Sequence, residues 1–179
     1  MRADRLRKRF PGGTWCFLST SGVLVLLMLF AGSLPVLGDE VGFIQPGPKD
    51  KCPVCGMFVS GYPNWIAEVI FKDGSYAVFD GPKDMFTYYF TISKYTREKT
   101  KTDISALFVT EYYTTKVISA RDVYFMLGSD VVGPMGSELV PVHGKEAAQQ
   151  FMKDHHGKRM LAFDEITPED IPSMGMVNK

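Results

Sequence analysis

The sequence predicts an α+β protein of two similar strand–strand–helix–strand lobes, with a largely antiparallel sheet. Three observations predict it: short β-rich runs with hairpin signals, two helical segments that each follow an X-Gly dipeptide, and recurrence of one element order in both halves. The length of 179 residues suits one domain or two small ones sharing a core, and 45% apolar residues exclude a disordered chain.

The first lobe is predicted over residues 51–119. Asp73-Gly74 is a hairpin signal between its first two strands. Asp80-Gly81-Pro82 precedes a helix predicted from Lys83 to about Lys94, with Asp80 or Gly81 as the N-cap and Pro82 at the first helical position. The predicted strands are residues 65–71, 75–79, 106–113 and 116–119.

The second lobe is predicted over residues 120–166. His143-Gly144 precedes a helix from Lys145 to about Lys153, as Asp80-Gly81 precedes the first helix. Residues 128–136 are predicted to be a loop. The predicted strands are residues 120–127, 139–142 and 159–163. Outside the lobes we expect a Gly- and Pro-rich linker at 39–50 and a mobile tail at 167–179.

The amino terminus predicts export. Residues 1–38 hold five basic residues and one acidic residue, and no charged side chain occurs from Phe10 to Gly38. This pattern is typical of a secretory signal peptide cleaved after Gly38, and an uncleaved membrane anchor is the alternative. A lipoprotein would need a Cys just after the apolar run, and Cys16 lies before it. In a bacterium, residues 39–179 would reach the periplasm or the periplasmic face of the inner membrane.

The formal net charge of zero argues against a nucleic-acid partner, which normally requires a basic face. The charge is uneven, since residues 39–179 carry 15 Lys+Arg against 19 Asp+Glu. No Ser-His-Asp pattern and no Gly-rich phosphate loop occurs in the sequence, and we expect a protein that is not an enzyme.

The strongest local feature is residues 51–58 (KCPVCGMF). On an extended segment Cys55 and Met57 project to the same side, and a turn through residues 53–54 would bring Cys52 toward them. Thiolate and thioether sulfur are soft donors that suit Cu(I). A disulfide and a thiol–disulfide oxidoreductase remain alternatives.

A zinc site is a third alternative, with Cys52, Cys55 and two of the three histidines as ligands. Taken separately, each histidine has a plainer role: His143 lies at a helix start, and the adjacent pair His155-His156 lies near a helix end. Met174 and Met176 form a Met-x-Met in the tail, which could bind Cu(I) weakly.

Met135 lies in a Gly-Pro-Met-Gly loop, where a methionine has little reason to belong to the core. It is a candidate third sulfur ligand, and a chance loop methionine is the alternative. By contrast, Met85, Met126 and Met160 lie on periodic segments and are expected in the core.

Two stretches together, Cys55-Gly56-Met57 after an export signal and residues 128–141 (GSDVVGPMGSELVP), make the chain resemble the NosL family over about residues 50–165. These are accessory proteins of nitrous oxide reductase. The resemblance implies a periplasmic Cu(I) chaperone that helps to load the copper–sulfur centre of the reductase together with a membrane transporter. It also implies the two-lobed fold. Family members are typically lipoproteins, and this chain departs from them in lacking the lipidation cysteine.

The resemblance carries the family's Cys-x-Met onto Cys55 and Met57, and its later loop methionine onto Met135. Cys52 is auxiliary, as a further ligand or as a redox partner of Cys55. We therefore expect a three-coordinate Cu(I) site of Cys55, Met57 and Met135 between the lobes, with Cys52 joining or exchanging.

Overall fold

The computed structural model describes residues 42–172. The predicted signal peptide or anchor at residues 1–38 lies outside the described residues, and so does the end of the predicted tail at 173–179. In the part of the chain that the structure describes, no helix is long and apolar enough to cross a membrane.

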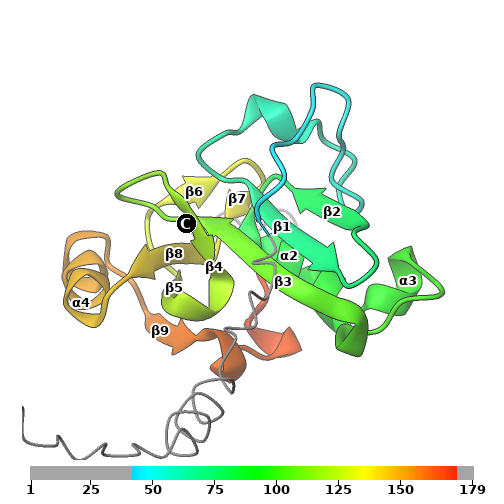
Figure 1. Ribbon diagram of the computed structural model, residues 1–179. Helices are drawn as coiled ribbons and strands as arrows, with labels where there is room; N and C mark the ends of the chain where they lie inside the picture. Colours follow the sequence, from blue (N-terminus) through cyan, green and yellow to red (C-terminus); the bar gives the residue numbers. More distant parts are fainter. Residues whose placement is uncertain (1–41, 173–179) are drawn as a thin grey trace, which may run out of the picture. The chain divides into compact units, whose positions relative to one another are not determined.

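The first lobe is a four-stranded antiparallel sheet in the order β2-β1-β3-β4 (Figure 1). The predicted hairpin joins β1 to β2. Gly74 has φ +81°, and the Asp73 carboxylate accepts hydrogen bonds from the amide and hydroxyl of Ser75. All five residues of β1 are buried, as expected for a central strand. The strands are β1 Ala67–Phe71, β2 Tyr76–Phe79, β3 Ile104–Thr110 and β4 Val117–Ser119.

A buried carboxylate holds the beginning of the described chain on this sheet. Glu68 on β1 has no exposed surface, and its Oε2 accepts a hydrogen bond from the Ile44 amide at 3.0 Å. Its Oε1 has no hydrogen-bond partner among the described residues. Phe43 meets Phe108 of β3 edge-on, with ring centroids 6.3 Å apart. Residues 43 and 44 of the predicted linker therefore pack on the first lobe.

The helix predicted from Lys83 to about Lys94 is two helices, α2 (Pro82–Phe90) and α3 (Ile92–Tyr95). The N-terminus is as predicted, with Gly81 as the N-cap and Pro82 at the first position. The break is at Thr91, where ψ rises to 39° and the side chain donates to the carbonyl of Thr87 at 2.7 Å. Such a bond can bend a helix, but Thr87 makes the same bond to the carbonyl of Lys83 inside α2 without a break, so the hydroxyl alone does not account for the difference.

The second lobe repeats the topology of the first. Its sheet has the order β8-β5-β9, so the first strand of each lobe is central and its helix connects the next two strands. The two-lobed α+β prediction is thus confirmed. The elements are β5 Val123–Leu127, β8 Val140–His143, α4 Lys145–Asp154 and β9 Arg159–Ala162. Short 3-10 turns occur at Val59–Gly61, Lys101–Asp103, Ala120–Asp122, Phe163–Glu165 and Pro168–Asp170.

The predicted loop at residues 128–136 contains a small hairpin instead. β6 (Val132–Gly133) pairs with β7 (Gly136–Ser137), and Pro134-Met135 form the two-residue turn. Gly136 has φ +86°, a conformation that favours glycine. Strands of two residues are too short to show the alternation from which a strand is predicted.

The lobes share one core through α2. The ring of Phe86 packs on Phe125 of β5 (centroids 4.9 Å) and on Phe163 (5.2 Å), so a helix of the first lobe covers the second sheet. The opposite face of that sheet packs against α4, with Met126 and Phe151 buried between them. Because β5 contributes to both clusters, four of its five residues are buried.

The start of the predicted mobile tail is packed. The Asp170 carboxylate accepts from the amide and hydroxyl of Thr167, pairs with Arg159 of β9, and is 9% exposed. Ile171 packs against the shared core. Residues 167–171 of the predicted tail therefore make a capping interaction and an apolar contact that the composition did not indicate, and the mobility of the tail stays a prediction.

Glu68 should make stability depend on pH. Burial raises its pKa from an ordinary 4.5 to about 7, so the folded state holds the proton more tightly than the unfolded state. The contribution of protonated Glu68 to the free energy of unfolding is fully present below pH 4.5 and is lost as pH rises through 7. From pH 5 to pH 8 the free energy of unfolding should fall by about 1–3 kcal/mol relative to Glu68→Gln, measured by urea denaturation. Equal slopes for the two proteins would contradict this assignment.

Candidate metal centre

The two cysteines lie in a tight loop before the first sheet. The Gly56 amide donates to the carbonyl of Cys52, and the Cys52 amide donates to the carbonyl of Met57, both at 2.9 Å. Gly56 has φ +81°, which allows the chain to reverse there. The turn through residues 53–54 that the sequence predicted thus brings Cys52 back toward Cys55.

Two aspartates complete a cluster with these cysteines. The Cys52 thiol donates to Asp84 Oδ2 at 3.2 Å, and the Cys55 thiol donates to Asp80 Oδ1 at 3.1 Å. One ligand atom from each of the four residues lies within 4.8 Å of the others. Asp80 follows β2 directly, and Asp84 is in the first turn of α2. Three segments of the first lobe therefore converge on one small volume.

Burial sets the electrostatics of the cluster. It raises the pKa of Cys52 far above its ordinary range, although the amides of Cys55 and Val54 donate toward the sulfur and oppose the shift. Burial likewise raises the pKa of Cys55 to about 12, against a hydrogen bond from the Met57 amide. The metal-free cluster therefore holds its thiol protons, and a metal ion must displace them.

Asp84 supplies a further candidate ligand atom for a metal ion. Burial raises its pKa, and its Oδ1 has no hydrogen-bond partner among the described residues. Buried polar atoms are normally paired, so an unpaired one beside two thiols is a candidate ligand atom.

The second lobe reaches this cluster through the β6–β7 hairpin. Lys83 Nζ donates to the carbonyl of Met135 at 2.8 Å. Lys83 adjoins Asp84 in the first turn of α2, so the backbone of Met135 lies against the helix that carries Asp84. Met57 and Met135 are both partly buried.

Glu138 fixes that arrangement. Its carboxylate is fully buried and accepts hydrogen bonds from the amide of Lys83 in α2 and from its neighbour Leu139. It lies so close to Gly81 that a Cβ there would overlap it. A residue of the second lobe thus caps the N-terminus of the first lobe's helix, and burial raises the pKa of Glu138 to about 8.

The histidines do not reach the cluster. It contains none of the three among the described residues. His155 Nδ1 pairs with Asp130 at 3.0 Å, and the backbone amide of His143 donates to Glu111. The zinc alternative that used two histidines is therefore wrong, because the fold places them on the second lobe's strand and helix ends.

The redox alternatives are disfavoured. Cys52 and Cys55 are free thiols, each bonded to a carboxylate. Reactive cysteines have a lowered pKa, and both of these are raised. No helix starts at the motif; the nearest helical turn after it is the three-residue Val59–Gly61.

Sequence reasoning did not identify Asp80 and Asp84 as site residues, although Asp80 was considered as a helix cap. The one signal in the sequence was the spacing of Asp80 and Asp84, two carboxylates four residues apart at the start of a predicted helix. Nothing in the spacing of residues 52–55 and 80–84 indicated that these segments would meet.

The protein is therefore a small α+β protein in which four side chains of metal-binding types lie close together. Residues 44–171, more than half of the chain, match the family model described as NosL. The protein therefore belongs to the NosL family, which confirms the resemblance seen in the sequence.

One solved structure agrees in fold, and a second has lower similarity. The crystal structure of the copper chaperone NosL from Shewanella denitrificans is similar with a TM-score of 0.61 and 23% identity, covering 72% of this chain and 97% of that one. The solution NMR structure of the apo-NosL protein from Achromobacter cycloclastes is 20% identical, with a TM-score of 0.43 over 62% of this chain and 93% of that chain. No curated protein gives a match.

The raised pKa of Cys55 predicts slow alkylation of the metal-free protein. The iodoacetamide rate at Cys55 should keep rising about tenfold per pH unit through pH ~10, where an ordinary thiol levels off near 9. Asp80→Asn removes the neighbouring carboxylate and should bring the plateau to lower pH. Mass spectrometry of the modified peptide measures both rates. A plateau near pH 9 in the unaltered protein would contradict the assignment.

Proposed function

We propose that this protein is a non-enzymatic copper chaperone that carries Cu(I) outside the cytoplasm. The observation that carries the proposal is the convergence of two cysteine sulfurs in one cluster, in a chain that belongs to the NosL family. The similar protein from Shewanella denitrificans is a copper chaperone. Cu(I) is the cargo of such a protein rather than a resident cofactor.

Cys55 is the anchor ligand in this proposal, because its sulfur is less buried than that of Cys52 and so open to an arriving ion. Met57 and Met135 complete a three-coordinate sulfur site, and Cys52 joins or exchanges. Support for Met135 comes from the Lys83 bond that holds its backbone against α2. Thioethers suit a transfer site because they bind Cu(I) without a proton to lose.

Release follows from the same ligand set. One strong thiolate and two weaker thioethers allow an acceptor to replace the ligands one at a time. When the ion leaves, the thiols regain protons and can again donate to Asp80 and Asp84, as they do in the metal-free protein. The carboxylates thereby give the empty site a stable resting state.

The client we propose is nitrous oxide reductase, whose copper–sulfur centre would receive the ion in cooperation with its membrane-bound maturation transporter. Residues 1–38 would export the chain to the periplasm, and if uncleaved would hold it at the inner membrane. A strain lacking the gene should produce reductase deficient in that centre, and the native gene should restore it where Cys55→Ser does not. Reductase with normal copper content in the deletion strain would exclude this client.

Ligand roles can be separated by competition with a chromophoric Cu(I) chelator at neutral pH. Cys55→Ser should abolish retention of Cu(I). Met135→Leu should weaken binding by about tenfold while leaving the fold intact, since it removes a thioether and keeps the side-chain volume. Met152→Leu on α4 is the matched control and should bind normally. Equal affinity of the Met135 and Met152 variants would remove Met135 from the site.

A zinc-binding structural module is the second candidate, favoured by one observation: carboxylates are the partners of both thiols in the metal-free protein. Two thiolates and two carboxylates can form a tetrahedral zinc site. Under the copper proposal, the double change Asp80→Asn with Asp84→Asn should lower Zn(II) affinity by more than tenfold and Cu(I) affinity by less than about threefold. A larger loss for Cu(I) than for Zn(II) would contradict the all-sulfur site.

A further inference from the structure

A groove of about 430 Å³ runs along the outer edge of β2, beside the cysteine loop. One wall is the loop itself, through Asp50, Lys51 and Pro53. The floor is the edge of β2, and the other wall comes from Tyr88 of α2 and Thr96, which follows α3. Pro53 lies between the two cysteines in the sequence, so one wall of the groove belongs to the loop that carries them, although no member of the cluster lines the groove itself.

The edge of β2 offers unpaired backbone groups to this groove. The amide of Phe71 donates to the carbonyl of Ser75 at 2.8 Å, and Ala77 lies opposite Val69 two residues further on. Antiparallel ladders alternate, so the N–H and C=O groups of Tyr76 and Val78 point away from β1. Among residues 42–172 no strand pairs with that edge. Tyr76 is 41% exposed, so the edge is open at that residue, whereas Val78 is 3% exposed, so an added strand reaches its backbone only if the groove widens there.

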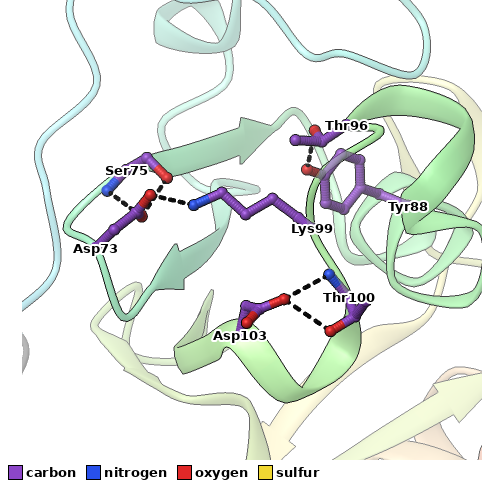
Figure 2. A network of polar contacts seen from close by, with 7 residues as sticks. All are labelled: Asp73, Ser75, Tyr88, Thr96, Lys99, Thr100 and Asp103. Atoms are coloured by element: carbon purple, nitrogen blue, oxygen red, sulfur yellow. Dashed lines mark hydrogen bonds and ion pairs between the residues drawn. The ribbon is translucent and has the colours of Figure 1, made fainter.

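Polar contacts occur on the helical wall of the groove and just outside its lining (Figure 2). Lys99 reaches across to Asp73 in the β1–β2 turn, and Asp73 also accepts from Ser75. On the helical side, the hydroxyls of Tyr88 and Thr96 are 2.7 Å apart. The Tyr88–Thr96 contact joins two residues of one wall, and the Lys99–Asp73 pair lies outside the groove lining, so both contacts order the segments around the groove before a partner binds.

We propose that an extended segment of the copper-accepting protein binds in this groove as an added strand on β2. Only an extended backbone supplies N–H and C=O groups at the spacing that Tyr76 and Val78 require, and strand addition at an open edge is a recurrent mode of peptide recognition. An added strand would run toward Asp80 and Cys55, so docking would bring acceptor ligands to the ion. The identity of the partner as an acceptor rests on the proposed function; the docking itself does not.

Charge at the rim specifies the segment further. The Asp50 carboxylate is already used by the amide of Gly47 at 2.8 Å and by the hydroxyl of Tyr76 at 3.4 Å. Lys51 is exposed and lies over the ring of Phe58, which is itself 52% exposed. The segment that fits is therefore a strand with an acidic residue near Lys51 and an apolar residue for Phe58.

The test uses two synthetic strand peptides, acetyl-TVEVEV-amide and acetyl-TVKVKV-amide, with the ¹⁵N-labelled metal-free protein. The acidic peptide, at up to about 5 mM, should shift the amide signals of Tyr76 and Val78 and slow their hydrogen exchange at least threefold. The basic peptide should bind at least fivefold more weakly. In Lys51→Glu the order of the two peptides should reverse.

A matched pair of variants tests the strand geometry. Tyr76→Pro removes the outward N–H without touching a bond to β1 and should abolish binding, whereas Tyr76→Ala keeps the N–H and should retain it. If Tyr76→Pro fails to fold, the Lys51→Glu reversal decides. Absence of shifts, shifts at another sheet edge, or self-association through β2 without peptide would each overturn the proposal. Because the peptide experiment contains no copper, a failure of peptide binding would not bear on the Cu(I) chelator competition. A failure of Cu(I) binding would likewise not bear on peptide binding.

Discussion

The arrangement of the site depends on one buried interaction between the lobes, the Glu138 carboxylate at the N-terminus of α2. The first amides of a helix have no partner within the helix, and here the second lobe provides one for Lys83. The same region contains the Lys83–Met135 bond. Two hydrogen bonds thus set the position of the hairpin turn relative to α2, and Gly81 leaves the space that the carboxylate fills. This cap adds to the shared core, in which Phe86 of α2 packs on the second sheet, and fixes the hairpin turn beside the start of α2.

Under the proposed function, the protonated cluster would keep a Cu(I) site reduced outside the cytoplasm until its ion arrives. Buried thiols that donate to carboxylates have a raised pKa, and a thiol that keeps its proton is a weak nucleophile toward disulfides. Burial raises these pKa values most, and the carboxylates of Asp80 and Asp84 add to the shift, so both should slow oxidation of the thiols. Cu(I) can displace the protons because its bonds to thiolate are far stronger than a thiol–carboxylate hydrogen bond.

Local pattern was sufficient to predict much of the fold. The β1–β2 hairpin follows from Asp73-Gly74, and the start of α2 follows from Gly81-Pro82, because these residues act on their immediate neighbours. No Gly or Pro marks the break at Thr91, and the β6–β7 hairpin is too short to show a period. At both places the observed structure differs from the prediction because the hydrophobic periodicity of the sequence does not report such local features.

The site was predictable only in part. The cysteine loop was visible because its ligands lie three residues apart in sequence. Asp84 lies 32 residues from Cys52, and the Glu138 cap lies 55 residues from Lys83, so both contacts are products of tertiary packing. The link between the Met135 turn and α2 likewise depends on the long side chain of Lys83, whose role no local spacing reveals.

The most direct test of the central claim is X-ray absorption at the copper edge of the Cu(I)-loaded protein, compared with Met135→Leu. The account predicts a first shell of sulfur alone, with one sulfur fewer in the variant. A shell that contains oxygen or nitrogen, and that is unchanged in Met135→Leu, would contradict a sulfur site shared by the two lobes.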